Sequence, residues 1–141
     1  MASINDIMTR KVSTIELDAT LQTAAQRMRD LDIGALPVTD EGALVGMVTD
    51  RDIAMRAVAA GLNLSDALVS DVMTAKMQSC SQSDTVDAVL VQMGTAQLRR
   101  LPVLDGEHRI VGIVSLADLA TRQSTPTDLA LREISERNPA A

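Results

Sequence analysis

The amino-acid sequence predicts a mixed α/β fold, of the α+β type, in which two copies of one β-α-β-β-α unit follow each other along the chain. Three observations lead to this prediction: an internal repeat, a helical spacing of apolar residues in each copy, and two short apolar segments around a turn in each copy. The units are expected to cover residues 1–62 and 63–124, and residues 125–141 are expected to form a tail with a short helix.

The repeat extends through each unit. The tetrapeptide at 6–9 (DIMT) returns 65 residues later at 71–74 (DVMT), and the tripeptide at 36–38 (LPV) returns at 101–103. Matches that keep one register across a whole unit indicate duplication rather than chance, so each copy is interpreted as one supersecondary unit.

Each unit begins with a short strand, expected at 12–16 and at 77–81, and continues into a helix. Apolar residues in the helix recur at i, i+3, i+4 and i+7, which places them on one buried face. These residues are Leu21, Ala24, Ala25, Met28 and Leu31 in the first unit, and Val86, Val89, Leu90 and Met93 in the second.

Two further strands form a hairpin in each unit. In the first unit they are expected at 35–39 and 44–48, joined by the turn residues 40–42 (DEG), and in the second unit at 101–104 and 110–114. Short apolar runs bounded by Gly and Asp are typical of strands beside a tight turn.

A second helix closes the first unit. It is expected at 50–60, with Gly61 in the left-handed position just beyond its end. A short helix is expected to begin at Asp71 with Ser70 as its cap, and another is expected at 128–137 in the tail.

The sheets must bury their apolar faces. We expect the two units to pack sheet-to-sheet about a pseudo-twofold axis, because each unit then covers the apolar face of the other. This arrangement would leave a cleft between the units, with one symmetric site on each side.

Composition and charge exclude several classes of function. The formal net charge is −6 and the chain contains no Phe, Tyr or Trp, whereas nucleic-acid binding requires a concentrated basic surface and often aromatic rings for stacking. No apolar run approaches the roughly 18 residues of a membrane span, and the N-terminus lacks the apolar core of a signal peptide. The sequence therefore predicts a soluble, cytoplasmic protein with no nucleic-acid partner and no membrane partner.

Neither an enzyme nor a metal site is expected. Cys80 is the only cysteine and His108 the only histidine, so one chain cannot form a Cys/His metal cluster. No nucleophile and base share a motif, and the P-loop signature is absent. We therefore predict a non-catalytic protein that requires no metal and no cofactor.

The pair Thr49 and Asp52 directly follows the apolar strand at 44–48. A hydroxyl residue at a helix start lies beside free backbone N–H groups and the positive end of the helix dipole, which favour a phosphate. Asp52 lies about one turn further along, and a carboxylate accepts hydrogen bonds from both hydroxyls of a ribose diol. Ser115 and Asp118 hold the same places in the second unit.

The same spacing has a purely structural interpretation. Ser or Thr followed three residues later by Asp is close to a capping box, although Glu or Gln is its usual fourth member. The bare spacing also occurs at 3–6, 81–84 and 125–128. Helix capping and ligand binding therefore both stay open for these residues.

Four stretches of the chain carry a family resemblance: 33–38 (IGALPV), 46–52 (GMVTDRD), 98–103 (LRRLPV) and 112–118 (GIVSLAD). At these stretches the chain resembles the tandem CBS-domain family, also called the Bateman module. It looks most like the bacterial stand-alone two-CBS proteins.

The resemblance implies a regulatory module that binds an adenosine nucleotide in the cleft between two CBS units. The implied ligand is AMP, ADP or ATP, with SAM or NAD as less favoured alternatives. It also implies energy sensing, regulation of an unknown protein partner, and a homodimer shaped as a flat disk of four CBS units. The alternative is a ligand-independent dimerisation or protein-interaction module.

Arg51 is a candidate for binding the phosphate. Its positive charge in the first helical turn opposes the helix dipole, and a bound phosphate would resolve that conflict. The alternative is an outward arginine paired with Asp50 or Asp52.

Arg99 and Arg100 precede the second Leu-Pro-Val strand, where the resemblance implies basic residues that reach ligand phosphates. The first unit has Gly34 and Ala35 at these places. We therefore expect two unequal sites, with the phosphate held mostly by the second unit. The alternative for the arginine pair is a solvated strand edge.

Residues around the start of each Leu-Pro-Val strand are candidates for the adenine pocket. Because the chain has no aromatic residue, an adenine would have to lie between aliphatic side chains. Plain core packing is the alternative for each of them, and both prolines suit a strand start or edge without a ligand. The candidates are Ile33, Gly34, Leu36 and Pro37 in the first unit and Leu98, Leu101 and Pro102 in the second, with Thr14 as a further contact.

Overall fold

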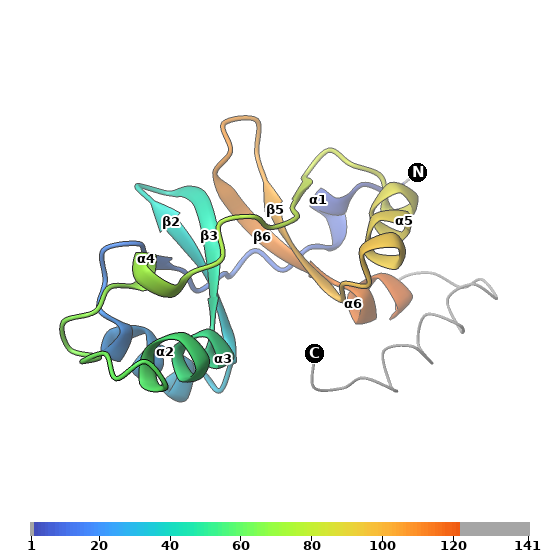
Figure 1. The fold of residues 1–141 in the computed structure, drawn as a ribbon. Helices are drawn as coiled ribbons and strands as arrows, with labels where there is room; N and C mark the ends of the chain where they lie inside the picture. The colour runs from blue at the N-terminus through green and yellow to red at the C-terminus, as the bar shows by residue number, and fades with distance from the viewer. Residues whose placement is uncertain (1, 122–141) are drawn as a thin grey trace. The chain divides into compact units, whose positions relative to one another are not determined.

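The computed structural model describes residues 2–121, and the predicted tail at 125–141 lies outside the described residues. The chain divides into two compact units, each with its own sheet (Figure 1). The middle unit runs from Ser13 to Met77. The terminal unit joins the N-terminal residues up to Val12 with the residues from Gln78 onward.

The middle unit contains a three-stranded sheet in the order β1-β2-β3. β1 (Ile15–Glu16) lies parallel to β2 (Ala35–Asp40), and β2 lies antiparallel to β3 (Ala43–Thr49). The two turn residues of the β2–β3 hairpin both have positive φ, 52° at Glu41 and 91° at Gly42, as in a type I′ turn. The predicted hairpin is confirmed.

The terminal unit repeats this topology. β4 (Cys80–Ser81) lies parallel to β5 (Arg100–Leu104), and β5 lies antiparallel to β6 (Ile110–Ser115). Both first strands are shorter than predicted at 12–16 and 77–81, because only two residues of each find backbone partners on the parallel neighbour. The two sheets and their helices confirm the mixed α/β fold with a duplicated unit.

The first helix of the middle unit is α2 (Leu21–Leu31), and it contains all the apolar residues that were predicted to lie on one helical face. Its N-cap Thr20 accepts a hydrogen bond from the N–H of Thr23 at 3.2 Å, and its C-cap Asp32 has left-handed backbone with φ 55°. The prediction that Leu31 faces the core was wrong, because this residue lies in the last helical turn and is 47% exposed.

The second helix of the middle unit departs from the α-helix predicted at 50–60. α3 (Asp50–Asp52) forms one helical turn, and η1 (Ile53–Val58) continues it as a π-helix. The wider turn is visible in the hydrogen bond from the N–H of Ala59 to the carbonyl of Ala54, five residues back, at 3.0 Å.

Within the described residues, the helices of the terminal unit are α1 (Ile4–Ile7), α5 (Val86–Ala96) and α6 (Leu116–Thr121). The N-cap Thr85 of α5 accepts a hydrogen bond from the N–H of Ala88 at 3.2 Å, as Thr20 does for α2. No helix within residues 2–121 has the length and apolarity needed to cross a membrane.

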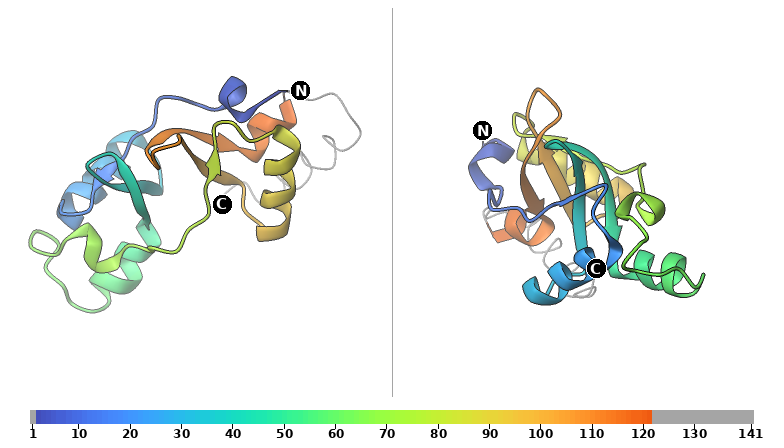
Figure 2. Two further views of the ribbon diagram at one scale, coloured as in Figure 1. Left: turned by 90° about the horizontal axis from the view of Figure 1, so that it is seen from above. Right: turned by 90° about the vertical axis from the view of Figure 1, so that its left-hand side faces the viewer.

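The predicted unit boundaries, 1–62 and 63–124, follow the repeat in the sequence but not the compact units in space. Residues up to Val12 lie with the second copy, where Figure 2 shows the blue N-terminal segment beside the orange hairpin of β5 and β6. In return, α4 (Val69–Val72), which opens the second copy in sequence, lies in the middle unit. The two copies therefore exchange their first segments.

Backbone hydrogen bonds fix both exchanged segments. Thr9 and Ile113 exchange N–H···O bonds of 2.8 and 2.9 Å in the terminal unit, and Thr74 and Met47 exchange bonds of 2.8 and 2.9 Å in the middle unit. The exchanged segment of the middle unit packs closely against Gly46, where an added Cβ would lie 2.7 Å from the carbonyl oxygen of Thr74.

The start of α4 also differs from the prediction. Ser70 does not cap this helix, because the helix begins at Val69, two residues earlier than predicted, and Leu68 is its N-cap. The carboxylate of Asp71 accepts a hydrogen bond from the N–H of Leu68 at 2.8 Å and so supplies the capping contact from inside the helix.

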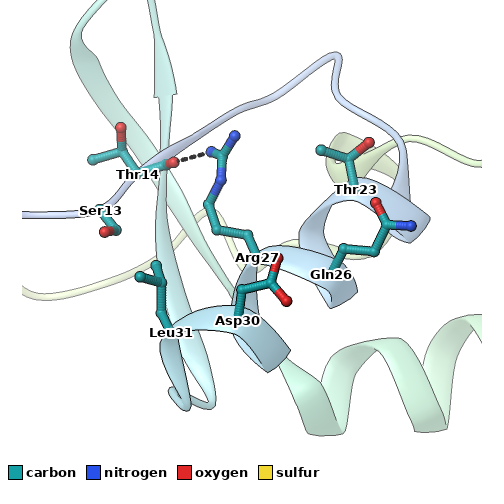
Figure 3. A pocket seen from close by; sticks show the side chains of 7 residues that line it. All are labelled: Ser13, Thr14, Thr23, Gln26, Arg27, Asp30 and Leu31. Atoms are coloured by element: carbon teal, nitrogen blue, oxygen red, sulfur yellow. Dashed lines mark hydrogen bonds between the residues drawn. The ribbon is translucent and has the colours of Figure 1, made fainter.

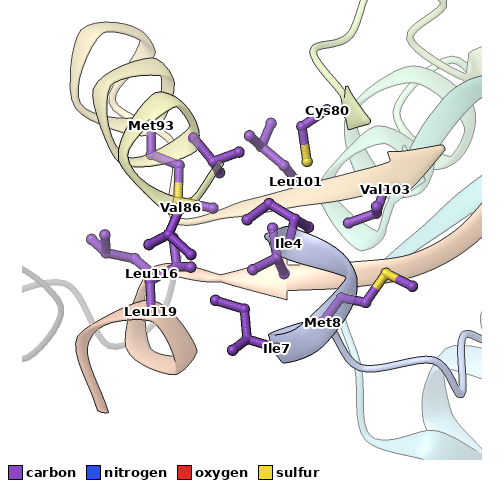
Figure 4. Close-up of a cluster of buried hydrophobic side chains, with 12 residues drawn as sticks. Ile4, Ile7, Met8, Cys80, Val86, Met93, Leu101, Val103, Leu116 and Leu119 are labelled. Carbon is purple, nitrogen blue, oxygen red and sulfur yellow. The ribbon is translucent and has the colours of Figure 1, made fainter. Parts of the chain in front are cut away.

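Each unit has its own hydrophobic core, and the core of the terminal unit is drawn in Figure 4. Both cores combine the buried face of the long helix with the inner face of the sheet and with the exchanged segment. Buried residues of the terminal core are Ile4, Ile7, Met8, Cys80, Val86, Val89, Met93, Leu101, Val103, Val114, Leu116 and Leu119. Those of the middle core are Ile15, Leu21, Ala24, Met28, Leu36, Val38, Val48, Ile53, Ala57, Val69 and Val72.

Candidate functional site

The predicted pair Thr49 and Asp52 forms a complete capping box where β3 passes into α3. The Thr49 hydroxyl oxygen accepts the N–H of Asp52 at 3.0 Å, and the Asp52 Oδ2 accepts the N–H of Thr49 at 3.0 Å. The Asp52 side chain is only 16% exposed. The capping alternative therefore describes the contacts of this pair, while the second carboxylate oxygen of Asp52 lies outside the box.

The second oxygen of Asp52 faces an arginine that sequence reasoning missed. The Nε of Arg56 lies 3.9 Å from the Asp52 Oδ1, and the Nη1 of the same guanidinium group donates a hydrogen bond to the carbonyl of Val72 at 3.3 Å. The signal was present in the sequence, because Arg56 follows Asp52 at the i+4 spacing that brings helical side chains together.

Arg51 is exposed and lies in the first helical turn, as predicted. Its backbone N–H donates to the Asp50 Oδ1 at 2.8 Å. The ion pair with Asp50 or Asp52, offered as the alternative for its guanidinium group, does not occur among the described residues, where Asp52 pairs with Arg56 instead.

The start of β2 lies directly beside this helix start. Ala35 pairs with Thr49 in the antiparallel ladder, and the N–H of Asp50 donates to the carbonyl of Gly34 at 2.9 Å. A Cβ on Gly34 would lie 3.1 Å from the Asp50 Oδ2. The hairpin thus brings together the two groups of predicted site residues at 33–37 and 49–52.

The terminal unit has the same arrangement with different side chains. Arg100 pairs with Ser115 in the ladder, and the N–H of Leu116 donates to the carbonyl of Arg99 at 2.7 Å. The Ser115 hydroxyl accepts the N–H of Asp118 at 3.0 Å. Two arginines therefore stand beside this helix start, at the places that Gly34 and Ala35 hold in the middle unit.

The predicted apolar contacts separate into two groups. Leu36 and Leu101 are 0% and 1% exposed and belong to the two cores, as the core-packing alternative describes. Ile33 and Leu98 are half-buried and pack against the edges of these cores. The prolines Pro37 and Pro102 are buried within β2 and β5.

Thr14 lines a hollow of about 460 Å³ in the middle unit (Figure 3). Its carbonyl accepts a hydrogen bond from the guanidinium group of Arg27 on α2. No other predicted site residue lines this hollow. The lining residues are Ser13, Thr14, Thr23, Gln26, Arg27, Asp30 and Leu31.

Cys80 belongs to the core of the terminal unit. Its thiol donates to the carbonyl of Pro102 at 3.7 Å. Burial, followed by the nearby charge of Asp84, raises the pKa of this thiol to about 12. Within residues 2–121, no group of three or more His, Cys, Asp or Glu side chains is arranged to hold a metal ion.

Similar proteins share the fold and most of the length of the chain. It is 39% identical to the CBS domain-containing protein YhcV of Bacillus subtilis over 140 residues, which covers 98% of this chain and 99% of that protein. It is 40% identical to hypoxic response protein 1 of Mycobacterium tuberculosis over 121 residues, covering 85% of this chain and 84% of that protein.

Solved structures of CBS-domain proteins have a fold similar to that of this chain. The structure of Hypoxic Response Protein I with two coordinated zinc ions matches with a TM-score of 0.77 and 40% identity, covering 87% of this chain and all of that one. The CBS domain pair of protein MJ0100, solved with 5-methylthioadenosine and S-adenosyl-L-methionine, matches with a TM-score of 0.70 and 28% identity, covering 86% and 95% of the two chains.

The model of the CBS domain matches the chain twice, at residues 4–59 and 69–124. These two matches account for the internal repeat and include both helix starts described above. The chain therefore belongs to the CBS-domain family, as a regulatory pair of CBS domains.

Proposed function

We propose that the chain is a non-catalytic regulatory module that binds an adenosine nucleotide at the helix starts of Asp52 and Asp118. One observation carries this proposal: in each unit the ladder places the start of the Leu-Pro-Val strand beside the helix start, through the pairs Ala35–Thr49 and Arg100–Ser115. A strand start and a helix start that adjoin in this way offer aliphatic surface, backbone amides and a carboxylate to one ligand.

Asp52 is the proposed contact for the ribose of the ligand in the middle unit. One of its oxygens is engaged by the N–H of Thr49, and the other is 3.9 Å from Arg56, longer than a strong hydrogen bond. An ionised carboxylate has about four acceptor positions, so capacity remains for a diol. Capping and ligand binding are therefore compatible in the same residue.

The phosphate is proposed to interact mainly with the terminal unit. The backbones of Arg99 and Arg100 lie beside the Ser115 helix start, and an Arg side chain binds phosphate oxygens through paired hydrogen bonds. At the equivalent place in the middle unit, Gly34 contributes no charge and Asp50 contributes a negative one. Arg51 would be the phosphate contact of that unit.

The chemical class of the ligand is supported by the MJ0100 pair, whose two ligands both contain adenosine. For this chain we propose AMP, ADP or ATP, with SAM or NAD as further candidates. Zinc does not form part of the proposal, because the chain has one Cys and one His and no acidic cluster joins either of them within residues 2–121.

Energy sensing and control of a protein partner follow from this proposal. The ligand would bias the conformation of the pair only by its differential affinity for two states. The predicted cleft between the units, the four-CBS homodimer and the regulated partner stay predictions.

The test is isothermal titration calorimetry with adenosine, AMP, ADP, ATP and SAM on the wild-type chain and on matched Asp→Asn variants. We expect binding by at least one compound and a loss of about tenfold or more in Asp52→Asn or Asp118→Asn, the scale of a hydrogen bond to a charged group. The controls are Asp71→Asn and Asp84→Asn, whose carboxylates make the same local contact to a backbone N–H at 2.8 and 2.9 Å. No binding by any compound, or equal losses in all four variants, would contradict the proposal.

A second candidate, a ligand-independent interaction module, is favoured by exposed apolar side chains on η1 and after it. Met55 and Val58 on η1 are 62% and 58% exposed, and Leu62 after it is 42% exposed. Light scattering on nucleotide-free protein tests this function. A dimer that Val58→Asp dissociates, together with an absence of nucleotide binding, would favour the interaction module over the sensor.

A further inference from the structure

Arg56 connects the proposed ribose contact to another part of the middle unit. One end of its guanidinium group lies 3.9 Å from Asp52 Oδ1, and the other donates to the carbonyl of Val72 at 3.3 Å. The Asp52 side chain is 16% exposed and that of Arg56 is 56% exposed. The arginine thus spans from the helix start to the C-terminal end of α4.

Val72 begins the stretch by which the chain leaves the middle unit. Met73 donates its N–H to the carbonyl of Val69 at 3.0 Å, and Thr74 bonds in both directions with Met47 on β3. Three residues after Thr74, the middle unit ends at Met77. A contact to the Val72 carbonyl therefore acts on the exit segment, residues 72–77, which joins the middle unit to the rest of the chain.

We propose that Arg56 is a positioning residue that couples the state of Asp52 to the exit segment. This proposal rests on the proposed function, because a ligand whose hydroxyls bind Asp52 would draw on the same carboxylate that faces Arg56. A ligand that binds the Asp52 carboxylate weakens its attraction for the Arg56 guanidinium group. The hydrogen bond from Arg56 to the Val72 carbonyl then changes as well. By linkage, a change in the exit segment alters the affinity of Asp52 for the ligand by the same factor.

Arg51 provides the matched comparison. It lies on the same helix and carries the same charge, but it makes no side-chain hydrogen bond or ion pair with the described residues. Loss of its charge changes the electrostatics of the helix start without touching the exit segment. If substitution of Arg56 has a larger effect on the exit segment than substitution of Arg51, the effect comes from the contacts of Arg56 with Asp52 and Val72 and not from the lost charge.

The first experiment uses the ligand-free chain of 141 residues and needs no nucleotide. Hydrogen exchange of the Met73 and Thr74 amides is followed by NMR in Asp52→Asn, Arg56→Met, the double variant and Arg51→Met. We expect each of the first two to accelerate exchange about two- to fivefold, the scale of a partly exposed ion pair, and the double variant to add nothing further. The proposal is overturned if the exchange rates of the two amides do not change, or if the effects of Asp52→Asn and Arg56→Met add in the double variant. An equal change of the exchange rates in Arg51→Met would also overturn it.

The second experiment adds adenosine, which has no phosphate, to the wild-type chain and to Arg56→Met and Arg56→Lys. We expect adenosine to change exchange at Met73 and Thr74 in the wild type, the change to be lost in Arg56→Met although adenosine still binds, and Arg56→Lys to restore part of it. If Arg56→Met still binds adenosine but its Met73 and Thr74 amides no longer respond, Arg56 couples the two places and is not merely required for the structure of the site. If the wild type binds no adenosine compound, the proposed function fails, and the ligand-free cycle alone decides whether Arg56 couples the two places.

Discussion

The backbone N–H of Thr49 and the Asp52 carboxylate are 3.0 Å apart, and the Asp52 N–H and the Thr49 hydroxyl are also 3.0 Å apart. The two residues proposed to contact the ligand therefore also start the helix that carries them. Each of them contributes to the stability of the fold and to the proposed site, and experiments must separate the two contributions.

Thr49→Ala is expected to lower the free energy of unfolding by about 1 kcal/mol, because the Asp52 N–H loses its cap. Urea denaturation followed by circular dichroism measures this change. Thr49→Ser keeps the hydroxyl and should retain most of the stability. If Thr49→Ala were as stable as the wild type, the capping box would have no energetic role.

Two glycine positions offer a contrast in close packing. Gly46→Ala places a Cβ 2.7 Å from the Thr74 carbonyl oxygen, a backbone atom that cannot move without disturbing the exchanged segment. We expect a loss of about 1–3 kcal/mol in the free energy of unfolding. The control is Gly94→Ala in α5, where no atom lies within 4 Å of the added Cβ and a gain of about 0.5–1 kcal/mol is expected. Equal effects of the two substitutions would refute the close approach.

Local sequence patterns were sufficient to predict most of the elements. The spacing of apolar residues predicted the helix that forms α2, and the DEG turn predicted the hairpin of β2 and β3, because both signals act within a few residues. The strand pairing that joins Gly34 to Asp50 follows from the same hairpin. The placement of the proposed site therefore rests on short-range information.

The remaining features depend on contacts that no local pattern encodes. The exchange of segments places Val69 and Val72 in the core of the first copy, and a repeat looks the same in sequence whether or not its copies exchange parts. The π-helix of η1 shifts the hydrogen-bond register by one residue, and a helix this short has too few apolar positions to distinguish the two periods.

The exchange predicts which fragment folds alone. Residues 13–77 contain the complete middle core, whereas residues 1–62 lack Val69 and Val72, which are 0% and 2% exposed. We expect the fragment 13–77 to unfold cooperatively and to give dispersed NMR spectra, while the fragment 1–62 remains unfolded, since a unit of about 60 residues has little stability to spare. A folded 1–62 fragment would show that the exchanged segment is dispensable.

Cys80 predicts a change of stability at alkaline pH. Its pKa rises from 9.0 to about 12 on folding, first through burial and then through the charge of Asp84. Between these two values the folded state holds a proton that the unfolded state has lost, so the free energy of unfolding falls as the pH rises from 9 to 12. The slope should approach about 1.4 kcal/mol per pH unit. Chemical denaturation of the wild type and of Cys80→Ala between these limits checks this, and an equal slope in both would contradict it.

The unequal helix starts predict that Arg100, the first residue of β5, contributes to binding of the phosphate rather than of the adenosine part of a nucleotide. Arg100 stands beside Ser115 in the ladder, whereas Ala35 holds the equivalent place beside Thr49. We expect Arg100→Ala to weaken AMP binding about three- to tenfold, as for an exposed charge-assisted hydrogen bond, and to leave adenosine binding nearly unchanged. Calorimetry with the two ligands measures the difference, and Arg29→Ala, an exposed arginine of α2 paired with Asp30, controls for the lost charge. An equal loss for both ligands would place Arg100 at the base or the sugar, because only a phosphate contact distinguishes AMP from adenosine.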